Sequence, residues 1–194
     1  MSKRIAYFTA AAFGALALTA TLVAPVSAQD KMMKSEMSGE KTVMVGGAAM
    51  FPSKNIVENA VNSKDHTTLV AAVKAAGLVD TLQSKGPFTV FAPTNAAFGK
   101  LPAGTVDTLV KPESKATLTK ILTYHVVAGK LEASDLSDGK KLKTVQGEEL
   151  TVKKADGKVM IVDAKGGSSM VTISNVNQSN GVIHVIDTVL LPAS

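Results

Sequence analysis

The chain has 194 residues, with 21 Lys+Arg against 16 Asp+Glu, and it contains no cysteine. The absence of cysteine excludes a disulfide framework, a thiol nucleophile and a zinc–thiolate site, so the fold must be held by its core. Aromatic residues make up 4% of the chain and Arg4 is the only arginine, which argues against nucleic-acid binding, because phosphate recognition favours arginine and single strands stack on aromatic platforms.

Residues 1–28 have the pattern of a secretory signal peptide. Lys3 and Arg4 form a positive start, an apolar run covers residues 5–24, and small residues precede a cleavage site after Ala28. The run is about long enough to span a bilayer, which leaves an uncleaved anchor as the alternative. The run is rich in Ala, Thr and Gly and so is only weakly hydrophobic. This composition and the cleavage-site pattern favour removal of the signal peptide. We therefore expect a secreted or periplasmic (cell-envelope) protein that is peripheral at most to the membrane.

Cleavage of the signal peptide changes the formal net charge of the chain. Lys3 and Arg4 leave with the signal, so 19 basic residues (21 minus two) face 16 acidic ones and the formal net charge falls from +5 to +3. Every remaining basic residue is a lysine, and acids are spread between the lysines along the chain. This composition predicts an ordinary solvated surface with at most a weak attraction to anionic polymers or membranes.

Residues 29–50 mix Lys, Glu, Ser, Gly and Met without a sustained period, which predicts a flexible Met/Lys-rich leader. Thioethers bind Cu(I), so the methionines are a candidate metal site. No His or Cys lies between them, which favours simple compositional bias and no metal site or cofactor. The methionines are Met32, Met33, Met37, Met44 and Met50.

From residue 51 the apolar residues recur at helical spacing. Ser53 is a candidate N-cap for a short helix that runs to about residue 61, and Asp65 or His66 opens a second helix. Gly77 suits the C-cap of that second helix, and residues 78–82 continue as a short third helix.

Residues 88–92 are rich in β-formers and lie between two prolines, which predicts a buried strand. Thr94 or Asn95 then caps a short helix that buries Phe98, although a polar helix start of this kind can also bind an anion. A helix follows over residues 113–124, where apolar residues form one stripe.

After residue 129 the apolar period changes from helical spacing to two. Residues 155–157 (Ala-Asp-Gly) suit a hairpin turn. Helices therefore come first and strands later, which predicts an α+β domain with a mainly antiparallel sheet. The predicted strands cover residues 144–145, 150–153, 158–162, 171–175 and 181–187.

Three segments, in order, carry a family signature. Two of them are Gly86-Pro-Phe-Thr-Val-Phe-Ala-Pro-Thr-Asn-Ala-Ala-Phe98 and Asn180-Gly-Val-Ile-His-Val-Ile-Asp-Thr-Val-Leu-Leu-Pro192. They resemble the two sequence boxes of the fasciclin-like domain family, and Tyr124-His125 matches the Tyr-His pair between the boxes. The resemblance covers about residues 55–192, and we place the fasciclin-like domain at residues 51–194.

The resemblance implies a fasciclin-like wedge, in which a helical layer packs on a mainly antiparallel β-sandwich. It also implies adhesion, or binding at cell surfaces and extracellular matrix. The chain resembles the single-domain form with a signal peptide that is common in bacteria. Its structural motif residues here are Phe88, Phe91, Pro93, Thr94, Asn95, Phe98, Gly181 and Pro192.

The candidate binding residues lie near the second box and the Tyr-His pair: Tyr124, His125, Asn180, His184 and Asp187. The alternative for Tyr124 and His125 is a buried, internally bonded place in the core, since a lone His among valines usually packs inside. His184 and Asp187 are three apart in a predicted strand and so face opposite sides. No nucleophile elbow or zinc-ligand spacing is present, so we predict no catalytic and no metal residue.

These observations favour a non-catalytic adhesion and binding module whose partner is a cell-surface or matrix protein or a glycan. A soluble carrier of a small hydrophobic ligand, such as a pigment or lipid, is a second hypothesis, suggested by the apolar strands and short helices. A polysaccharide hydrolase is a third; it needs two carboxylates facing a cleft. Glu148-Glu149 and Asp135/Asp138 are the candidates for that pair.

Overall fold

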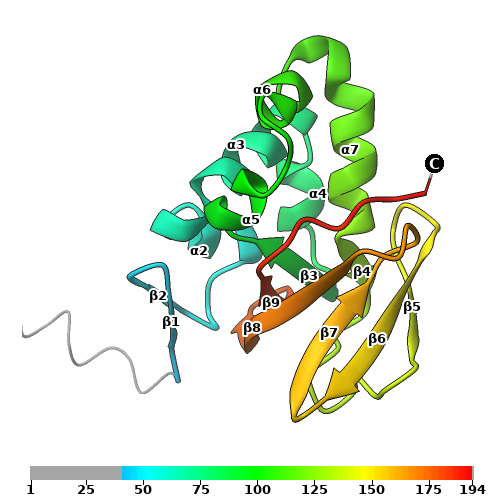
Figure 1. Cartoon of the computed structure of the whole chain (residues 1–194). Coiled ribbons are helices and arrows are strands. Elements are labelled where there is room, and N and C mark those ends of the chain that lie inside the picture. Colours follow the sequence, from blue (N-terminus) through cyan, green and yellow to red (C-terminus); the bar gives the residue numbers. More distant parts are fainter. Residues whose placement is uncertain (1–40, 194) are drawn as a thin grey trace, which may run out of the picture. The chain divides into compact units, whose positions relative to one another are not determined.

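A computed structural model describes residues 41–193. The predicted signal peptide, its cleavage site after Ala28 and most of the predicted leader, including Met32, Met33 and Met37, lie outside the described residues. In the described part, short helices gather on one side of a strongly curved sheet (Figure 1). The predicted α+β class is confirmed by this arrangement.

The described domain begins with a small hairpin. Strands β1 (Val43–Val45) and β2 (Ala48–Met50) pair antiparallel, and the amide of Lys64 donates to the carbonyl of Gly46 in their turn (3.2 Å). Val45 and Met50 are each 3% exposed and belong to the core. Residues 43–50, placed in the flexible leader from sequence, are therefore ordered, because two of their apolar side chains are buried against the helices.

The helices are short, and their caps explain their ends. Asn55, not the predicted Ser53, caps the first: its side chain accepts from the amide of Glu58, whose carboxylate accepts from the Asn55 amide. Gly77 ends helix α3 (Thr67–Ala76) at φ +73°, as predicted. The helical elements are α2 (Ile56–Ala60), η2 (Lys64–His66), α3 (Thr67–Ala76), α4 (Val79–Gln83), α5 (Asn95–Gly99), α6 (Thr105–Leu109), η3 (Pro112–Ser114) and α7 (Lys115–Tyr124).

The main sheet has seven strands in the order β4-β3-β9-β8-β7-β6-β5. All neighbours are antiparallel except β3 and β9, whose pairing is parallel and joins the two family boxes. The predicted hairpin turn is confirmed, with positive φ at Asp156 and Gly157. The strands are β3 (Phe88–Pro93), β4 (Val126–Ala128), β5 (Lys141–Lys143), β6 (Glu149–Ala155), β7 (Lys158–Val162), β8 (Ser168–Gln178) and β9 (Gly181–Ile186).

The sheet curls on itself, so that the half with β4, β3 and β9 faces the half with β7, β6 and β5 across a shared core, and β8 pairs with both halves. This arrangement agrees with the expected helical layer on a mainly antiparallel sandwich. A bridge between Val127 and Thr144 brings the β4 edge back to the β5 edge, so the sheet nearly closes into a barrel. The register of β8 shifts twice against β9, and such irregularities bend a strand and increase its twist. A strand was predicted at residues 144–145. In the structure Thr144 forms a single isolated bridge, and the regular strand β5 ends just before it.

Two cores lie on either side of the central pair β3 and β9. Val90 and Ala92 of β3 face the core under the helices, whereas Phe91 between them faces the core inside the curled half of the sheet. This alternation follows from the two-residue period of a strand. The central strands are therefore buried on both faces, as their continuous apolar sequences require.

Candidate functional site

His125 occupies the junction between α7 and β4 and is 2% exposed. Its Nε2 accepts from the amide of Leu190 (3.0 Å), so the ring proton lies on Nδ1, which donates to the carbonyl of Ile121 (2.8 Å). Burial lowers the pKa of His125 to about 4. The Ile121 carbonyl and the Asp163 carboxylate act in the opposite direction and raise this pKa, but burial is the larger effect. The neutral ring thus links α7 to the C-terminal segment.

Tyr124 is fully buried beside it. The hydroxyl accepts from the amide of Ala164 (2.8 Å) and donates to the carbonyl of Glu149 (3.3 Å), which connects β6 to the loop after β7. Burial, followed by the nearby carboxylates of Asp163 and Glu148, raises the pKa of Tyr124. Both members of the Tyr-His pair therefore hold structure together inside the protein, in agreement with the alternative that places them in the core.

The side chains of Asn180 and His184 also make internal contacts. The Asn180 amide oxygen accepts from Ile56 (3.1 Å), and its nitrogen donates to the carbonyls of Leu82 (2.6 Å) and Ser84 (3.0 Å). His184 donates from Nε2 to the carbonyl of Leu131 (2.8 Å) and has no exposed surface. Its ring stacks on Phe91, with centroids 5.7 Å apart.

Asp187 is the candidate binding residue that reaches the surface. Its carboxylate accepts from the amide of Met170 (2.9 Å) and the hydroxyl of Thr188 (3.0 Å), and it pairs with Lys100 (3.3 Å). Burial alone would raise the pKa of Asp187, but these three donors together hold that pKa below its ordinary value. The five candidates therefore do not converge on one exposed site.

The box residues build the scaffold. Thr94 caps α5 by accepting from the amide of Ala97 (3.2 Å), as predicted. Asn95 bonds to the amide of Thr68 (3.0 Å) and the carbonyl of Lys64 (2.8 Å), which ties α3 and η2 to α5. Both side chains are used internally, so neither is left to bind an anion.

Close packing explains the glycine and the large residues of the boxes. A Cβ at Gly181 would lie 2.0 Å from the carbonyl oxygen of Phe88, so the parallel pairing of β9 with β3 tolerates only glycine there. Among the predicted motif residues, Phe88 is half-buried, and the buried ones are Phe91, Pro93, Phe98, Gly181 and Pro192.

The carboxylates considered for a hydrolase also have structural partners. Asp135 accepts from the amide of Glu132 (3.0 Å), Asp138 from that of Lys154 (2.8 Å) and Glu148 from that of Ala193 (2.7 Å). Glu149 pairs with Lys141 (3.3 Å). Within residues 41–193 no group of three His, Asp or Glu side chains is placed to hold a metal ion.

The outward face of β5, β6 and β7 carries a row of lysines that could not be seen from the sequence. Lys143 and Lys141 on β5, Lys153 on β6 and Lys158 on β7 occupy four alternate rows of the strand register, which are the successive outward-facing rows. Neighbours in this row are about 7 Å apart along a strand and roughly 7–8 Å across one. All four are exposed, and we call them the lysine stripe.

Side chains alternate between the inward and outward faces of β5, β6 and β7, which explains why these lysines share a face. Leu142, Leu150, Val152 and Ile161 point into the curled half of the sheet and are at most 3% exposed, so the residues between them must point out. Half-buried Thr151, Met160 and Val162 lie between the lysines. Glu149 is the acidic residue of this face, which leaves four lysines against one carboxylate.

The sequence comparisons place the chain in a family. The model described as "Fasciclin domain" matches residues 64–192, and the chain belongs to the fasciclin domain family. Protein sll1483 of Synechocystis sp. is 52% identical over 79% of this chain and 82% of its own length. The cell surface glycolipoprotein MPB83 of Mycobacterium bovis is 41% identical over 76% of this chain and 64% of its own length.

A solved structure supports the same fold. A FAS1 domain pair from the insect cell adhesion molecule fasciclin I matches 73% of this chain and 52% of that chain, with a TM-score of 0.65 and 21% sequence identity. At this identity the match shows the fold alone, and it agrees with the family assignment. No helix within residues 41–193 is long and apolar enough to cross a membrane.

Proposed function

We propose that this protein is exported and acts as a non-catalytic adhesion module, which binds a carboxylated polysaccharide of the cell surface or matrix through the lysine stripe. The observation that carries the proposal is the stripe itself: four exposed lysines in four successive outward-facing rows of one sheet face. Export is supported by the signal-peptide pattern of residues 1–28 and by a relative that is named as a cell surface glycolipoprotein.

The charges of the stripe are available to a partner. Among the ion pairs of residues 41–193, one involves the stripe, between Lys141 and Glu149 (3.3 Å), and both side chains are more than half exposed. Lys143, Lys153 and Lys158 take part in none of them. An ammonium is a compact charge on a flexible stem, so a row of them suits a linear polymer that carries carboxylates at intervals.

A mixed groove lies at one end of the stripe. It is open, has a volume of about 580 Å³, and includes Lys141, Lys143 and Thr151 in its lining. Asp163 in this groove accepts from the amides of Gly167 (2.7 Å) and Leu191 (3.1 Å). The carboxylates here reduce the local positive charge, so we assign the strongest polymer contacts to the opposite end, at Lys153 and Lys158.

A polysaccharide fits this face better than a bilayer or a nucleic acid. The apolar residues of the face, Met160 and Val162, are half-buried and lie between the lysines, so they offer little surface to insert among acyl chains. The mature chain has no arginine and the face has no aromatic platform for bases. Each exposed ion pair contributes little alone, about 0–1 kcal/mol, so binding by the stripe depends on several contacts and on multiple copies.

The test compares two triple variants of the mature protein with equal charge change. One is Lys143→Glu/Lys153→Glu/Lys158→Glu on the stripe, and the other is Lys111→Glu/Lys115→Glu/Lys120→Glu near and on α7. Binding to immobilised polygalacturonate is measured at about 0.05 and 0.5 M salt, with dextran as the neutral control. We expect the stripe variant to lose about tenfold or more in affinity and salt to weaken binding by the unmodified protein.

Equal losses in both variants, or equal binding to dextran, would refute the stripe as the binding face. A deletion strain complemented with each variant extends the test to adhesion. Restored attachment with the α7 variant and not with the stripe variant supports the proposal. Attachment that is unchanged on deletion would refute the adhesive role itself.

A further inference from the structure

The C-terminal segment of the domain is held by side chains and not by backbone pairing. Residues 188–193, which we call the C-terminal strap, follow β9 and run between the helical layer and the curled half of the sheet (Figure 1, red). Within residues 41–193, no backbone carbonyl accepts from a strap amide. The strap is nevertheless packed, since Val189 is 5% exposed and Leu190 is 1% exposed. Its position therefore depends on the side chains that its amides meet.

Three of the strap amides donate to side chains that titrate. The acceptors are one imidazole and two carboxylates, and they come from the end of α7, from the loop after β7 and from the turn before β6. A fourth amide, that of Thr188, donates to the hydroxyl of Ser169 (3.0 Å). An imidazole nitrogen that takes up a proton can no longer accept a hydrogen bond, and a protonated carboxyl group accepts less well. The attachment of the strap therefore depends on pH. The three bonds are Leu190 to His125 Nε2 (3.0 Å), Leu191 to Asp163 (3.1 Å) and Ala193 to Glu148 (2.7 Å).

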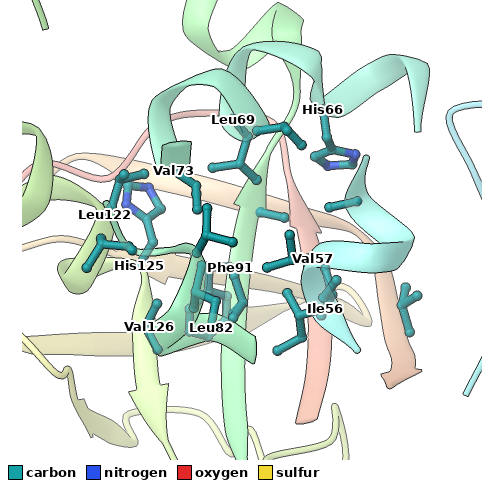
Figure 2. Close-up of a pocket in the computed structure, with 18 of the residues that line it drawn as sticks. Ile56, Val57, His66, Leu69, Val73, Leu82, Phe91, Leu122, His125 and Val126 are labelled. Atoms are coloured by element: carbon teal, nitrogen blue, oxygen red, sulfur yellow. The ribbon is translucent and has the colours of Figure 1, made fainter. Parts of the chain in front are cut away.

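The His125 imidazole is covered by the strap at the atom that takes up a proton. Its Nδ1 already carries a hydrogen and donates to Ile121, so a further proton must enter at Nε2, where the Leu190 amide lies. Figure 2 shows the ring beside Leu122, where both line an apolar cavity of about 50 Å³. Water finds no polar partners in such a cavity and leaves it dry. Water therefore reaches Nε2 when the strap moves away.

The charges around the ring do not keep it protonated while the strap is in place. Asp163 faces His125 from the loop after β7 and favours the charged imidazole, but burial outweighs it and the pKa of His125 is lowered to about 4. A solvated imidazole takes up its proton near pH 6.5. The other titratable groups near the three bonds or along the same cavity are Tyr124, Lys141, Lys143, Glu149, Lys165, His66 and Lys74.

We propose that the C-terminal strap is a proton-sensitive latch: a proton taken up at His125 Nε2 releases residues 188–193 while the sheet and the helices stay folded. Opening is linked to proton uptake, because the pKa of the imidazole is lowered only while the strap covers it. The opening equilibrium is therefore constant above about pH 6.5 and rises as the pH falls toward 4, by up to roughly 300-fold over the 2.5 pH units between the two pKa values.

Release of the strap changes the mixed groove at the end of the lysine stripe. Ala193 lines that groove together with Lys141 and Lys143. When the strap leaves, the groove loses this wall residue, and the Ala193 amide no longer faces the Glu148 carboxylate. The latch itself does not depend on the stripe as a binding face, so it is tested without any polymer.

Amide hydrogen exchange followed by NMR tests the latch in the unmodified mature protein. Exchange is measured at several pH values from 7.5 to 5, without urea and in low urea, and corrected for the intrinsic rate at each pH. We expect the protection of the Leu190 amide to fall about 30-fold from pH 7.5 to 5 and to change little with urea, since a local opening exposes little surface. Amides of β3 and β9 should be more protected and strongly urea-dependent.

Two outcomes of this measurement would overturn the proposal. One is protection of Leu190 that does not change with pH, which would remove His125 as the trigger. The other is exchange of Leu190 with the same urea dependence as β3 and β9, which would mean that the strap leaves only when the whole domain unfolds.

Two glutamine variants separate the trigger from the general titration of buried histidines. In His125→Gln the side chain still accepts a hydrogen bond but does not titrate, so the pH dependence of Leu190 protection should disappear. His184→Gln is the matched control, because His184 is also buried with a lowered pKa but bonds to Leu131 and not to the strap. This control should keep the 30-fold response expected above.

Circular dichroism verifies that both variants fold. If His125→Gln does not fold, the pH and urea dependence of the unmodified protein decides. An undiminished pH response in folded His125→Gln, or an equal loss of response in both variants, would contradict the assigned role of Nε2.

Discussion

The buried, neutral His125 predicts a specific loss of stability in mild acid. In the unfolded chain its imidazole titrates near pH 6.5, whereas burial lowers the pKa to about 4 in the folded protein. Between these values the unfolded chain takes up a proton that the folded protein does not. Stability is therefore complete above pH 6.5, falls as the pH drops from about 6.5 to 4, and loses nothing further from this group below pH 4.

The size of the effect follows from the two pKa values. A difference of about 2.5 units, at 1.36 kcal/mol per unit, gives a loss of about 3 kcal/mol. This is a large fraction of the 5–15 kcal/mol that stabilises a typical domain. The structural cause is clear: a proton on Nε2 would remove the acceptor of the Leu190 amide and leave a charge in a site with 2% exposure.

Urea unfolding at several pH values from 7.5 to 4, for the unmodified protein and a His125→Gln variant, measures this term. Gln offers one donor and one acceptor but does not titrate. The pKa values of His66 and His184 are also lowered, in each case chiefly by burial, and their contribution is present in both proteins. We expect the free energy of unfolding to fall by about 3 kcal/mol more in the unmodified protein. Parallel pH profiles would refute the assignment.

Three substitutions test the scaffold by chemical denaturation. Gly181→Ala should prevent folding or cost more than about 3 kcal/mol, because its Cβ would overlap the Phe88 carbonyl, whereas Gly99→Ala, with open space around it, should be close to neutral; similar values for the two would contradict this. Asn180→Ala should cost about 2–4 kcal/mol, since two buried backbone groups and one partly buried group lose their partner. Thr94→Ala should cost about 1 kcal/mol as a lost N-cap, and an unchanged midpoint would argue against the cap.

Local patterns made much of the fold predictable. The glycine at residue 77, the turn at Asp156 and Gly157 and the cap at Thr94 each depend on a few adjacent residues, and each is present where predicted. The order of helices before strands was enough for the α+β class. These features depend on backbone conformations and hydrogen bonds within a few residues, which a single sequence contains directly.

Features that depend on pairing between distant segments were not predictable in the same way. The leader was placed as far as residue 50, yet the burial of Val45 and Met50 depends on helices that follow later in the chain. The near closure of the sheet into a barrel was not predicted either, because it requires a bridge between Val127 and Thr144 on separate strands. The lysine stripe likewise requires the register of β5, β6 and β7, since its members are spread over 18 positions, from Lys141 to Lys158.

The burial of the family-signature residues limits what the signature says about function. The polar side chains of Tyr124, His125 and Asn180 are buried and bonded to the backbone of other segments. Side chains used in this way fix the fold but cannot discriminate one partner from another. The signature therefore identifies the scaffold, and our proposal places recognition on outward residues between the Tyr-His pair and the second box, where the lysine stripe lies. A shared fold then implies no shared partner, because each family member can vary these outward residues without disturbing the core.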